Sequence, residues 1–138
     1  MNDFVVDSGV LVKAFLPEEY SEMARRIIKD SAPLAAPDLI WIEAANVIWK
    51  RTQRGDISPH DAPALLEDML RAPIDTHSSF NLVRRAAALA AETGRSIYDC
   101  MYLALALRDG LVFLTADERF YNALKNGPYA AHIRWLGE

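Results

Sequence analysis

The sequence predicts an α/β fold in which helices cover both faces of a parallel sheet. Short apolar runs rich in β-forming residues occur at 4–6 and 111–114, as expected of buried strands. Longer segments with helical periodicity lie between and after them. Strands that alternate with helices are typical of a parallel sheet with both faces covered.

Length and composition are those of an ordinary globular protein. The chain has 138 residues, of which 51% are hydrophobic and 25% charged. This length suits one domain, 1–138, and is sufficient to bury a core. The net charge of −4 counts against non-specific nucleic-acid binding, which depends on neutralising phosphates. A local basic patch or a substrate held through metal ions is still compatible with this charge.

Cysteine usage and apolar runs predict a cytoplasmic protein. The single cysteine, Cys100, excludes an internal disulfide and a cysteine-rich zinc site, and it fits a reducing compartment. The N-terminus lacks the basic and apolar regions of a signal peptide. The longest apolar run, 100–107, is too short to span a bilayer.

Prolines and glycines divide the first half of the chain into helices around one brief extended segment. Asp38 is a candidate cap for a long helix that Gly55 closes, and Ser58-Pro59 is a typical helix start. Helices are predicted for residues 10–16, 18–30, 39–54 and 58–71, with an extended segment at 33–37.

The second half alternates more regularly. Gly94 and Gly110 each follow the end of a predicted helix, and Ser96 precedes the start of one. Strands are predicted for 74–77, 111–114 and 133–136, and helices for 78–92, 97–109 and 115–124.

The first strand runs directly into an acid. Asp7 follows Phe4-Val5-Val6, and Gly9 then allows the chain to turn sharply. In open α/β sheets, ligands bind beyond the carboxyl ends of the strands. Asp7 is therefore a candidate functional residue, although a turn or helix-cap role would also explain it.

Glu43 interrupts a helix that is apolar almost all round, and such a helix is expected to be buried. It shares one stripe with Asn46 and Lys50, and its mid-helix position excludes a capping role. A buried glutamate needs a partner. The alternative to a functional role is a salt bridge to Lys50 or to an arginine of a neighbouring element.

Two further acids begin helices. Asp99 completes a capping-box pattern with Ser96, and capping alone would explain it. The apolar segment that follows nevertheless indicates a buried helix whose N-terminus faces inward. Asp117 lies just past the predicted strand 111–114, as Asp7 follows the first strand. Thr115 and Glu118 form a second capping-box pattern that does not need Asp117. The alternative role of Asp117 is to stabilise the helix dipole in the first turn.

Convergence of Asp7, Glu43, Asp99 and Asp117 would require cations. Four neighbouring carboxylates repel one another, and hard divalent ions such as Mg²⁺ or Mn²⁺ prefer carboxylate and water oxygens. An all-oxygen site with open positions suits phosphoryl chemistry, because the metal lowers the pKa of a bound water and stabilises the leaving oxygen.

These residues resemble those of the PIN-domain ribonucleases, in particular the VapC-type toxins of toxin–antitoxin pairs. The resemblance covers nearly the whole chain, and the order and spacing of the motifs make it specific. Its four motifs are Val5-Val6-Asp7-Ser8, Glu43-Ala44-Ala45-Asn46-Val47, Tyr98-Asp99-Cys100-Met101-Tyr102-Leu103-Ala104-Leu105-Ala106 and Leu114-Thr115-Ala116-Asp117.

The resemblance implies a three-layer α/β/α fold with a central parallel sheet of about five strands. It also implies a metal site made by the four acids. Asp7 and Asp99 are expected to be the principal ligands of Mg²⁺ or Mn²⁺, with Asp117 assisting directly or through water. Glu43 is expected to ligate the metal or to position the attacking water.

Supporting roles also follow from the resemblance. Asn46 is expected to orient Glu43, and Ser8 and Thr115 to supply hydroxyls behind the acids. The sequence departs from many relatives at Gly9, where they carry a hydroxyl residue. That departure affects the expected supporting hydroxyls and not the acids.

Other candidate groups predict no separate chemistry. His60, His77 and His132 lie on separate elements without metal-ligand spacing and are expected at the surface. Cys100 is expected to be inert core. The basic stretch 50–54 ends the helix that carries Glu43, and it could contact phosphates or complement the helix dipole.

The sequence therefore predicts a metal-dependent endoribonuclease that cleaves structured RNA, with tRNA or rRNA as substrate, and so inhibits translation. The alternatives are a catalytically silent binding protein and a metal-dependent phosphatase acting on small molecules. The resemblance implies a cognate antitoxin. A homodimer that also binds the antitoxin is expected, through Trp41, Ile48, Trp49 and the helices before residue 72.

Overall fold

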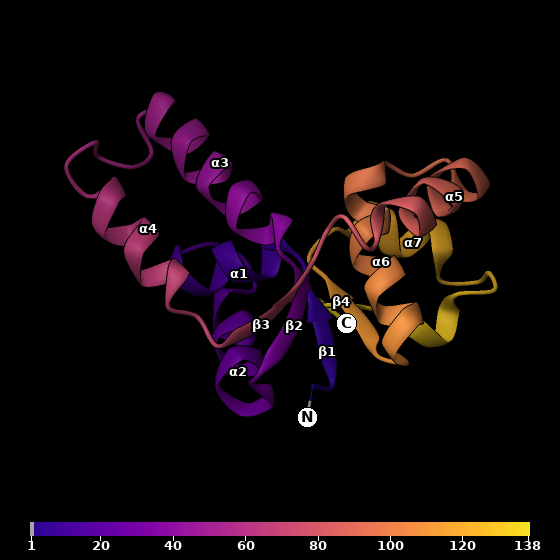
Figure 1. Cartoon of the computed structure of the whole chain (residues 1–138). Helices are drawn as coiled ribbons and strands as arrows, with labels where there is room; N and C mark the ends of the chain where they lie inside the picture. Colours follow the sequence, from indigo (N-terminus) through magenta and orange to yellow (C-terminus); the bar gives the residue numbers. More distant parts are fainter. Residues whose placement is uncertain (1) are drawn as a thin grey trace.

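The computed structural model describes residues 2–138, within which five strands form one sheet (Figure 1). All neighbouring strands run parallel, in the order β3-β2-β1-β4-β5. The predicted α/β class and a sheet of about five strands are therefore confirmed. The strands are β1 (Phe4–Val6), β2 (Leu34–Pro37), β3 (Ile74–His77), β4 (Val112–Thr115) and β5 (Ile133–Trp135).

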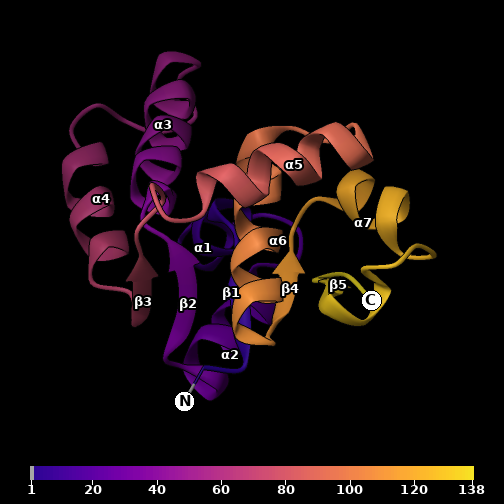
Figure 2. The same cartoon turned by 45° about the vertical axis from the view of Figure 1, so that its right-hand side comes forward.

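Helices lie on both faces of the sheet. In Figure 2, α6 lies in front of the strands, with α5 against its upper end, and α1 and α2 lie behind them. The pair α3 and α4 projects beyond the end of the sheet (Figures 1 and 2). The helices are α1 (Ser8–Phe15), α2 (Ser21–Ser31), α3 (Leu39–Gln53), α4 (Ala62–Leu70), α5 (Val83–Thr93), α6 (Ile97–Asp109), α7 (Glu118–Leu124) and the short 3₁₀ helix η1 (Ala130–His132).

The core lies where α6 packs on the central strands. Every residue of α6 from 100 to 106 is buried, as its unbroken apolar run predicts. Val5 and Val6 of β1 are fully buried, and Phe113 of β4 stacks on Tyr102 of α6. A central strand covered on both faces has no polar side, which explains the continuous apolar runs of β1 and β4.

The strand order places a switch point beside β1. The chain first proceeds outward from β1 through β2 to β3, and then returns to place β4 on the other side of β1. Ligands in open α/β sheets bind beyond the carboxyl ends of the strands at such a point. Val6 pairs with Leu114, so the residues after β1 and at the end of β4 are neighbours.

Several predicted helix starts are wrong, because the residues expected to cap those helices lie in turns or strands instead. Residues 58–61 and 78–82 precede α4 and α5, which begin at Ala62 and Val83. Thr115 is the last residue of β4, and Asp117 caps α7. Helix α3 begins at residue 39 as predicted, but the side chain of Asp38 does not cap it, because its carboxylate accepts hydrogen bonds from Ser79 instead.

Helix ends agree better with the sequence. Gly94 and Gly110 follow α5 and α6 in the left-handed conformation that glycine adopts without strain.

The first two helices start at other residues than predicted. The first helix starts two residues before its predicted start at Val10, because Asp7 caps it. The second starts at Ser21 rather than Glu18, after Tyr20 in a left-handed conformation.

The expectation that α3 is buried all round is wrong. Its buried face consists of Ile40, Ala44 and Ile48, whereas Ile42 is 75% and Trp49 is 59% exposed. This follows from the position of α3, which projects with α4 beyond the sheet and so has only one covered face (Figure 1). None of the helices between residues 2 and 138 combines the length and the apolar character needed to cross a membrane.

Candidate metal-dependent active site

Asp7 is held rigidly at the switch point between β1 and β4. Its Oδ1 accepts a hydrogen bond of 2.9 Å from the backbone N–H of Val10, and its Oδ2 accepts one of 2.6 Å from the hydroxyl of Thr115. The backbone N–H of Ala116 also donates to this carboxylate, at 3.2 Å. The carboxylate therefore both caps α1 and ties β1 to the end of β4.

Burial controls the charge of Asp7. Removal from water raises its pKa to about 6, and the nearby Asp99 contributes in the same direction. The hydrogen bonds from Thr115, Val10 and Ala116 oppose this rise because they favour the carboxylate. A buried acid with a raised pKa at a switch point is typical of a functional site.

Glu43 is bound by a tyrosine and not by a cation. The hydroxyl of Tyr102 donates a short hydrogen bond to Glu43 Oε1. Burial raises the pKa of Glu43, and the hydrogen bond from Tyr102 lowers it. The negative charges of Asp7 and Asp99 raise the pKa of Glu43 further. A salt bridge to Lys50 was the alternative explanation, but the described ion pairs include none to Glu43.

Asp99 lies in the first turn of α6, where the helix dipole favours a negative charge. Its backbone N–H donates to Ser96 Oγ at 3.1 Å, so the serine caps the helix as predicted. This bond uses the backbone N–H of Asp99, and the Ser96 hydroxyl also lowers the pKa of the Asp99 carboxyl. Burial raises the pKa of Asp99, and the neighbouring Asp117 adds to this effect.

Asp117 caps α7, whereas the predicted helix 115–124 placed it in the first turn. Its Oδ1 accepts hydrogen bonds from the N–H groups of Arg119 and Phe120, at 3.0 and 3.2 Å, and caps α7. Its own N–H donates to Thr115 Oγ1 at 2.9 Å. Thr115 therefore connects the backbone of Asp117 to the carboxylate of Asp7.

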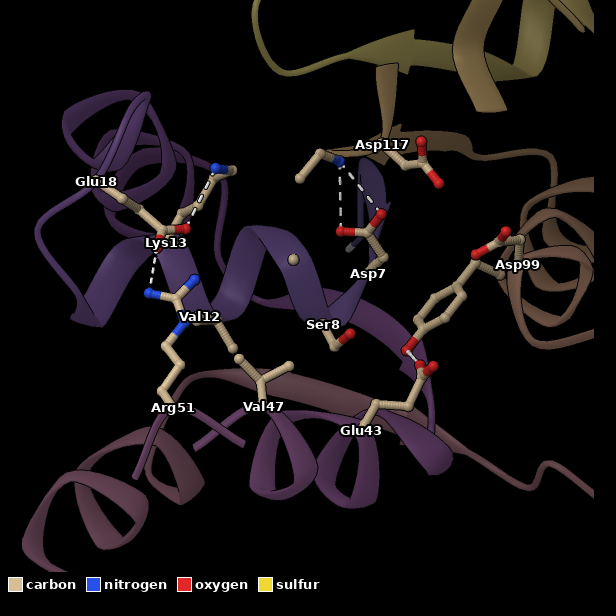
Figure 3. Close-up of a pocket in the computed structure, with 13 residues that line it drawn as sticks. Asp7, Ser8, Val12, Lys13, Glu18, Glu43, Val47, Arg51, Asp99 and Asp117 are labelled. Carbon is tan, nitrogen blue, oxygen red and sulfur yellow. Dashed lines mark hydrogen bonds and ion pairs between the residues drawn. The ribbon is translucent and has the colours of Figure 1, made fainter. Parts of the chain in front are cut away.

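The four acids line one pocket of about 320 Å³. Figure 3 shows Asp7, Glu43, Asp99 and Asp117 gathered at one end of it. They come from the ends of β1 and β4, the first turn of α6 and the middle of α3. The other residues that line the pocket are Ser8, Gly9, Val12, Lys13, Glu18, Val47, Arg51, Tyr102 and Ala116.

The donor set fits a hard divalent cation, because it consists of carboxylate and hydroxyl oxygens. In the part of the chain that the structure describes, no three acids, histidines or cysteines already stand close enough to share one ion. Mg²⁺ does not require this, since it usually binds through one or two carboxylates and keeps several waters.

The expected supporting residues differ in position. Thr115 donates to Asp7, and Ser8 lines the pocket. Asn46 is exposed, and the hydrogen bond to Glu43 comes from Tyr102 instead. Helical spacing could have indicated Tyr102, because it lies three residues after Asp99 and therefore on the same face of α6.

Gly9 is required by the close approach of two chain segments. A Cβ added to Gly9 would lie 2.8 Å from Ala116 Cβ and 3.2 Å from Asp7 Oδ1. A larger side chain at this position could enter only if one of these segments shifted. Glycine at this position therefore has a packing reason in this chain.

The histidines and the cysteine lie outside the pocket. His60 is exposed as expected, and His77 and His132 are half-buried and lie only partly at the surface. A ring nitrogen of His77 lies 3.0 Å from Arg108 Nη2, and His132 Nδ1 lies 2.8 Å from the Leu111 carbonyl oxygen. Cys100 is buried and free, as predicted.

Comparison with known proteins shows the family of the chain. The family model of the PIN domain matches residues 4–125. The chain belongs to the PIN-domain family. Ribonuclease VapC3 of Pyrobaculum aerophilum is 34% identical over 117 residues, which are 83% of this chain and 89% of that protein. The resemblance to VapC-type PIN domains is therefore confirmed.

Solved structures of PIN-domain size match over most of the chain. The crystal structure of PAE2754 from Pyrobaculum aerophilum has a TM-score of 0.68 and 25% identity, covering 91% of this chain and 89% of that one. VapC20 of Mycobacterium tuberculosis, described as a sarcin–ricin loop cleaving toxin, has a TM-score of 0.66 and 15% identity. The match covers 88% of this chain and 95% of the VapC20 chain. At that identity, the second likeness shows the fold alone.

Proposed function

We propose that this PIN-domain protein is a metal-dependent endoribonuclease that hydrolyses phosphodiester bonds in structured RNA, with tRNA or rRNA as substrate. The observation that carries the proposal is that acids from four separate elements line one pocket. None of them forms an ion pair among the described residues, so their charge is available to cations. The ribonuclease activity in the name of the VapC3 relative supports the same conclusion.

In this proposal, Asp7 and Asp99 are the principal ligands of Mg²⁺ or Mn²⁺, and Asp117 assists directly or through water. When bound, such an ion stabilises negative charge on the attacking and leaving oxygens. Thr115 and the N–H groups of Val10 and Ala116 fix the carboxylate of Asp7. That rigidity orients Asp7 before the ion arrives.

Glu43 orients the attacking water. Its Oε1 accepts the hydrogen bond from Tyr102, which leaves Oε2 free to accept one from the water. Burial raises the pKa of the Tyr102 hydroxyl, and the charge of Glu43 adds to this, so the hydroxyl keeps its proton and remains a donor. The RNA 2′-hydroxyl has no part in this arrangement.

The pattern of partners disfavours the two alternatives. Pairing of Asp7 or Glu43 with arginine would have favoured a catalytically silent protein, but hydroxyl and backbone donors hold both acids. A phosphatase for small molecules needs a compact site. This pocket instead extends along α1 and α3 away from the acids (Figure 3).

The test is cleavage of total RNA by the purified protein with Mg²⁺ or Mn²⁺, followed by sequencing of the RNA ends. Asp99→Asn should lower activity at least about a hundredfold and relieve growth arrest in the host. The matched control is Asp68→Asn, since Asp68 is an exposed acid on α4 outside the pocket. Failure of the wild-type protein to cut RNA with either metal would overturn the proposal.

Asp7→Asn should also abolish cleavage, but its interpretation is less direct. Three donors converge on the Asp7 carboxylate, and an amide nitrogen in place of one oxygen would face a donor. The carboxylate of Asp99 has no such set of donors in the described structure. Near-normal activity of either variant would contradict the proposed ligand set.

We further propose that the protein is the toxin of a type II toxin–antitoxin pair and forms a homodimer. Apolar side chains of α3 and α4 line a groove of about 370 Å³, in which Trp49 is largely exposed. Ile48, expected to contribute to a partner surface, also lines this groove, but it is only 4% exposed. Light scattering should give a dimer, and co-expression with the neighbouring open reading frame should yield a larger complex. A monomer unchanged by co-expression would contradict this.

A further inference from the structure

The pocket that holds the four acids has a second end of opposite character. Lys13 and Arg51 both reach Glu18 there, and Figure 3 shows the three residues together, away from Asp7. Arg51 Nη1 lies 2.5 Å from Glu18 Oε2, and Lys13 Nζ lies 3.2 Å from Glu18 Oε1. Their side chains are 20–26% exposed, so solvent reaches all three.

Helical spacing produces this layout. Glu43, Val47 and Arg51 follow one another at intervals of four residues on α3 and line the same pocket. Because a helix rises about 1.5 Å per residue, Arg51 lies about 12 Å along the axis from Glu43. Val12 of α1 lies beside Val47, so an apolar stretch separates the acidic end from the basic end (Figure 3).

The basic residues of the stretch 50–54 differ in their positions relative to the pocket. Only Arg51 of this stretch lines the pocket among the described residues. Lys50 is exposed, and Arg54 pairs with Asp56 at 3.4 Å, outside the pocket. The helix dipole explains a basic residue near the end of α3, but it does not explain why Arg51 turns into the pocket.

The charges at this end do not cancel. Lys13 and Arg51 carry two positive charges against the single negative charge of Glu18. A guanidinium group binds carboxylate and phosphate oxygens in the same forked geometry. The carboxylate of Glu18 therefore occupies a position that the two cations make favourable for an anion. Ion pairs this accessible to solvent contribute little to stability, so holding the fold together is a weak reason for the cluster.

We propose that Lys13 and Arg51 form a binding subsite for an RNA phosphate adjacent to the one that is cut. Glu18 holds the two cations in place in the free protein, and the RNA phosphate displaces it. The apolar stretch of Val12 and Val47 lies under the sugar and base that join the two phosphates. This inference rests on the proposed ribonuclease function and assigns five further residues to it.

The test measures binding of a short fluorescein-labelled single-stranded RNA of mixed sequence by anisotropy, over a series of KCl concentrations. Ca²⁺ replaces Mg²⁺, and the RNA is recovered intact after each titration. Arg51→Gln should weaken binding roughly tenfold, because a hydrogen-bonded charge is lost. It should also reduce the slope of log affinity against log salt by about 0.7, the value for one phosphate contact on a single strand.

Matched variants separate this role from a structural one. Arg71→Gln removes an exposed arginine that pairs with Asp68 outside the pocket, and it should change neither affinity nor slope. Lys13→Gln should act like Arg51→Gln. Arg51→Lys should keep the salt slope, because it keeps the charge. Glu18→Gln should tighten RNA binding several-fold, because it removes the competing anion, whereas Asp68→Asn should not.

Equal affinity and salt slope for Arg51→Gln and Arg71→Gln would overturn the subsite. Weaker binding by Glu18→Gln would overturn the competing role of Glu18. Thermal melts identify any variant that fails to fold, and Arg51→Lys then supplies the comparison. If the wild type cleaves total RNA but the Arg51 variants bind normally, only this inference fails. If the wild type neither cleaves nor binds RNA, the proposed function fails as well.

Discussion

The hydroxyl of Tyr102 donates a hydrogen bond to Glu43 from the helix that also carries Asp99. Tyr102 is 2% exposed and stacks on Phe113, so its position is fixed by the core. Asp99 lies three residues before it, on the same side of α6. One buried helix therefore positions an acid of the pocket directly and orients a second acid, on α3, through a hydroxyl.

Tyr102→Phe should lower kcat about tenfold and leave the fold intact. The phenyl ring keeps the packing, but Glu43 loses the donor that orients it, and partners of this kind typically contribute ten- to a hundredfold. The lost hydrogen bond also lowers the pKa of Glu43 in the wild type. Its removal should therefore shift the acidic limb of the pH–rate profile to higher pH.

Tyr121→Phe is the matched control for that variant. The hydroxyl of Tyr121 donates to Glu138 at 2.6 Å, outside the pocket, so this change removes a tyrosine–glutamate hydrogen bond of the same kind. Its kcat and pH profile should match those of the wild type. An unchanged pH profile for Tyr102→Phe would show that the Tyr102 bond does not act on the reaction.

The products should carry 5′-phosphate and 3′-hydroxyl ends. Water is the nucleophile in the proposed reaction, so the RNA 2′-hydroxyl is not consumed. A substrate with a single 2′-deoxy residue at the cut site should therefore still be cleaved, at a rate within a few-fold of the all-RNA substrate. End-specific ligation and mass spectrometry distinguish the products, and 2′,3′-cyclic phosphate ends would overturn the mechanism.

Gly9→Ala should destabilise the protein by about 1 kcal/mol and reduce activity. Alanine gains up to about 1 kcal/mol over glycine inside a helix, but overpacking costs about 1–3 kcal/mol. The second effect should dominate, because the added Cβ would lie 2.8 Å from Ala116 Cβ, which cannot rotate away. Urea unfolding measures the change. Gly127→Ala is the control, since a Cβ added there would lie 3.7 Å from the Leu124 carbonyl oxygen, an ordinary contact distance.

Local patterns predicted the strands and the helix ends well. The strand 74–77 agrees with the structure to the residue, and the glycines after α5 and α6 end those helices as expected. Each of these features depends on residues adjacent in the chain. Asp7 could be predicted as a candidate functional residue in the same way, because it directly follows a continuous apolar strand.

Hydrogen-bond partners that lie far apart in the chain explain most of the wrong predictions. Thr115 fits a local capping box, but its hydroxyl donates to Asp7, which is 108 residues away in the chain. Asp38 fits a cap, but it accepts from Ser79 instead. The contact of Arg51 with Glu18 likewise depends on the packing of α3 beside the segment after α1. Short-range patterns contain no information about such partners.

Metal-free stability should fall as the pH rises from about 4 to about 6. Burial raises the pKa of Asp7 in the folded protein from 3.8 to about 6. Between these values, the folded protein holds a proton that the unfolded chain has lost. Stability from this group is therefore fully present below pH 4 and is lost as the pH rises through 6. This shift in the pKa of Asp7 contributes on the order of 3 kcal/mol to the free energy of unfolding at low pH.

Divalent ions should reverse this trend at neutral pH. An ion that binds only the folded protein stabilises it by about 2.7 kcal/mol at a hundred times its Kd. Asp99 contributes to the raised pKa of Asp7, so Asp99→Asn should lessen the repulsion. In chelator at pH 7.5, this variant should melt on the order of 3 °C higher than the wild type. It should also gain less from Mn²⁺, because it lacks a ligand.

The helix cap does not confound that comparison. The bond to Ser96 Oγ comes from the backbone N–H at position 99, which asparagine keeps. Asp68→Asn again serves as the control, because Asp68 is an exposed acid paired only with Arg71 among the described ion pairs. Thermal melts of the three proteins, in chelator and in Mn²⁺, provide the measurement. If the wild type is the most stable in chelator and Mn²⁺ shifts none of them, the four carboxylates do not act as one site.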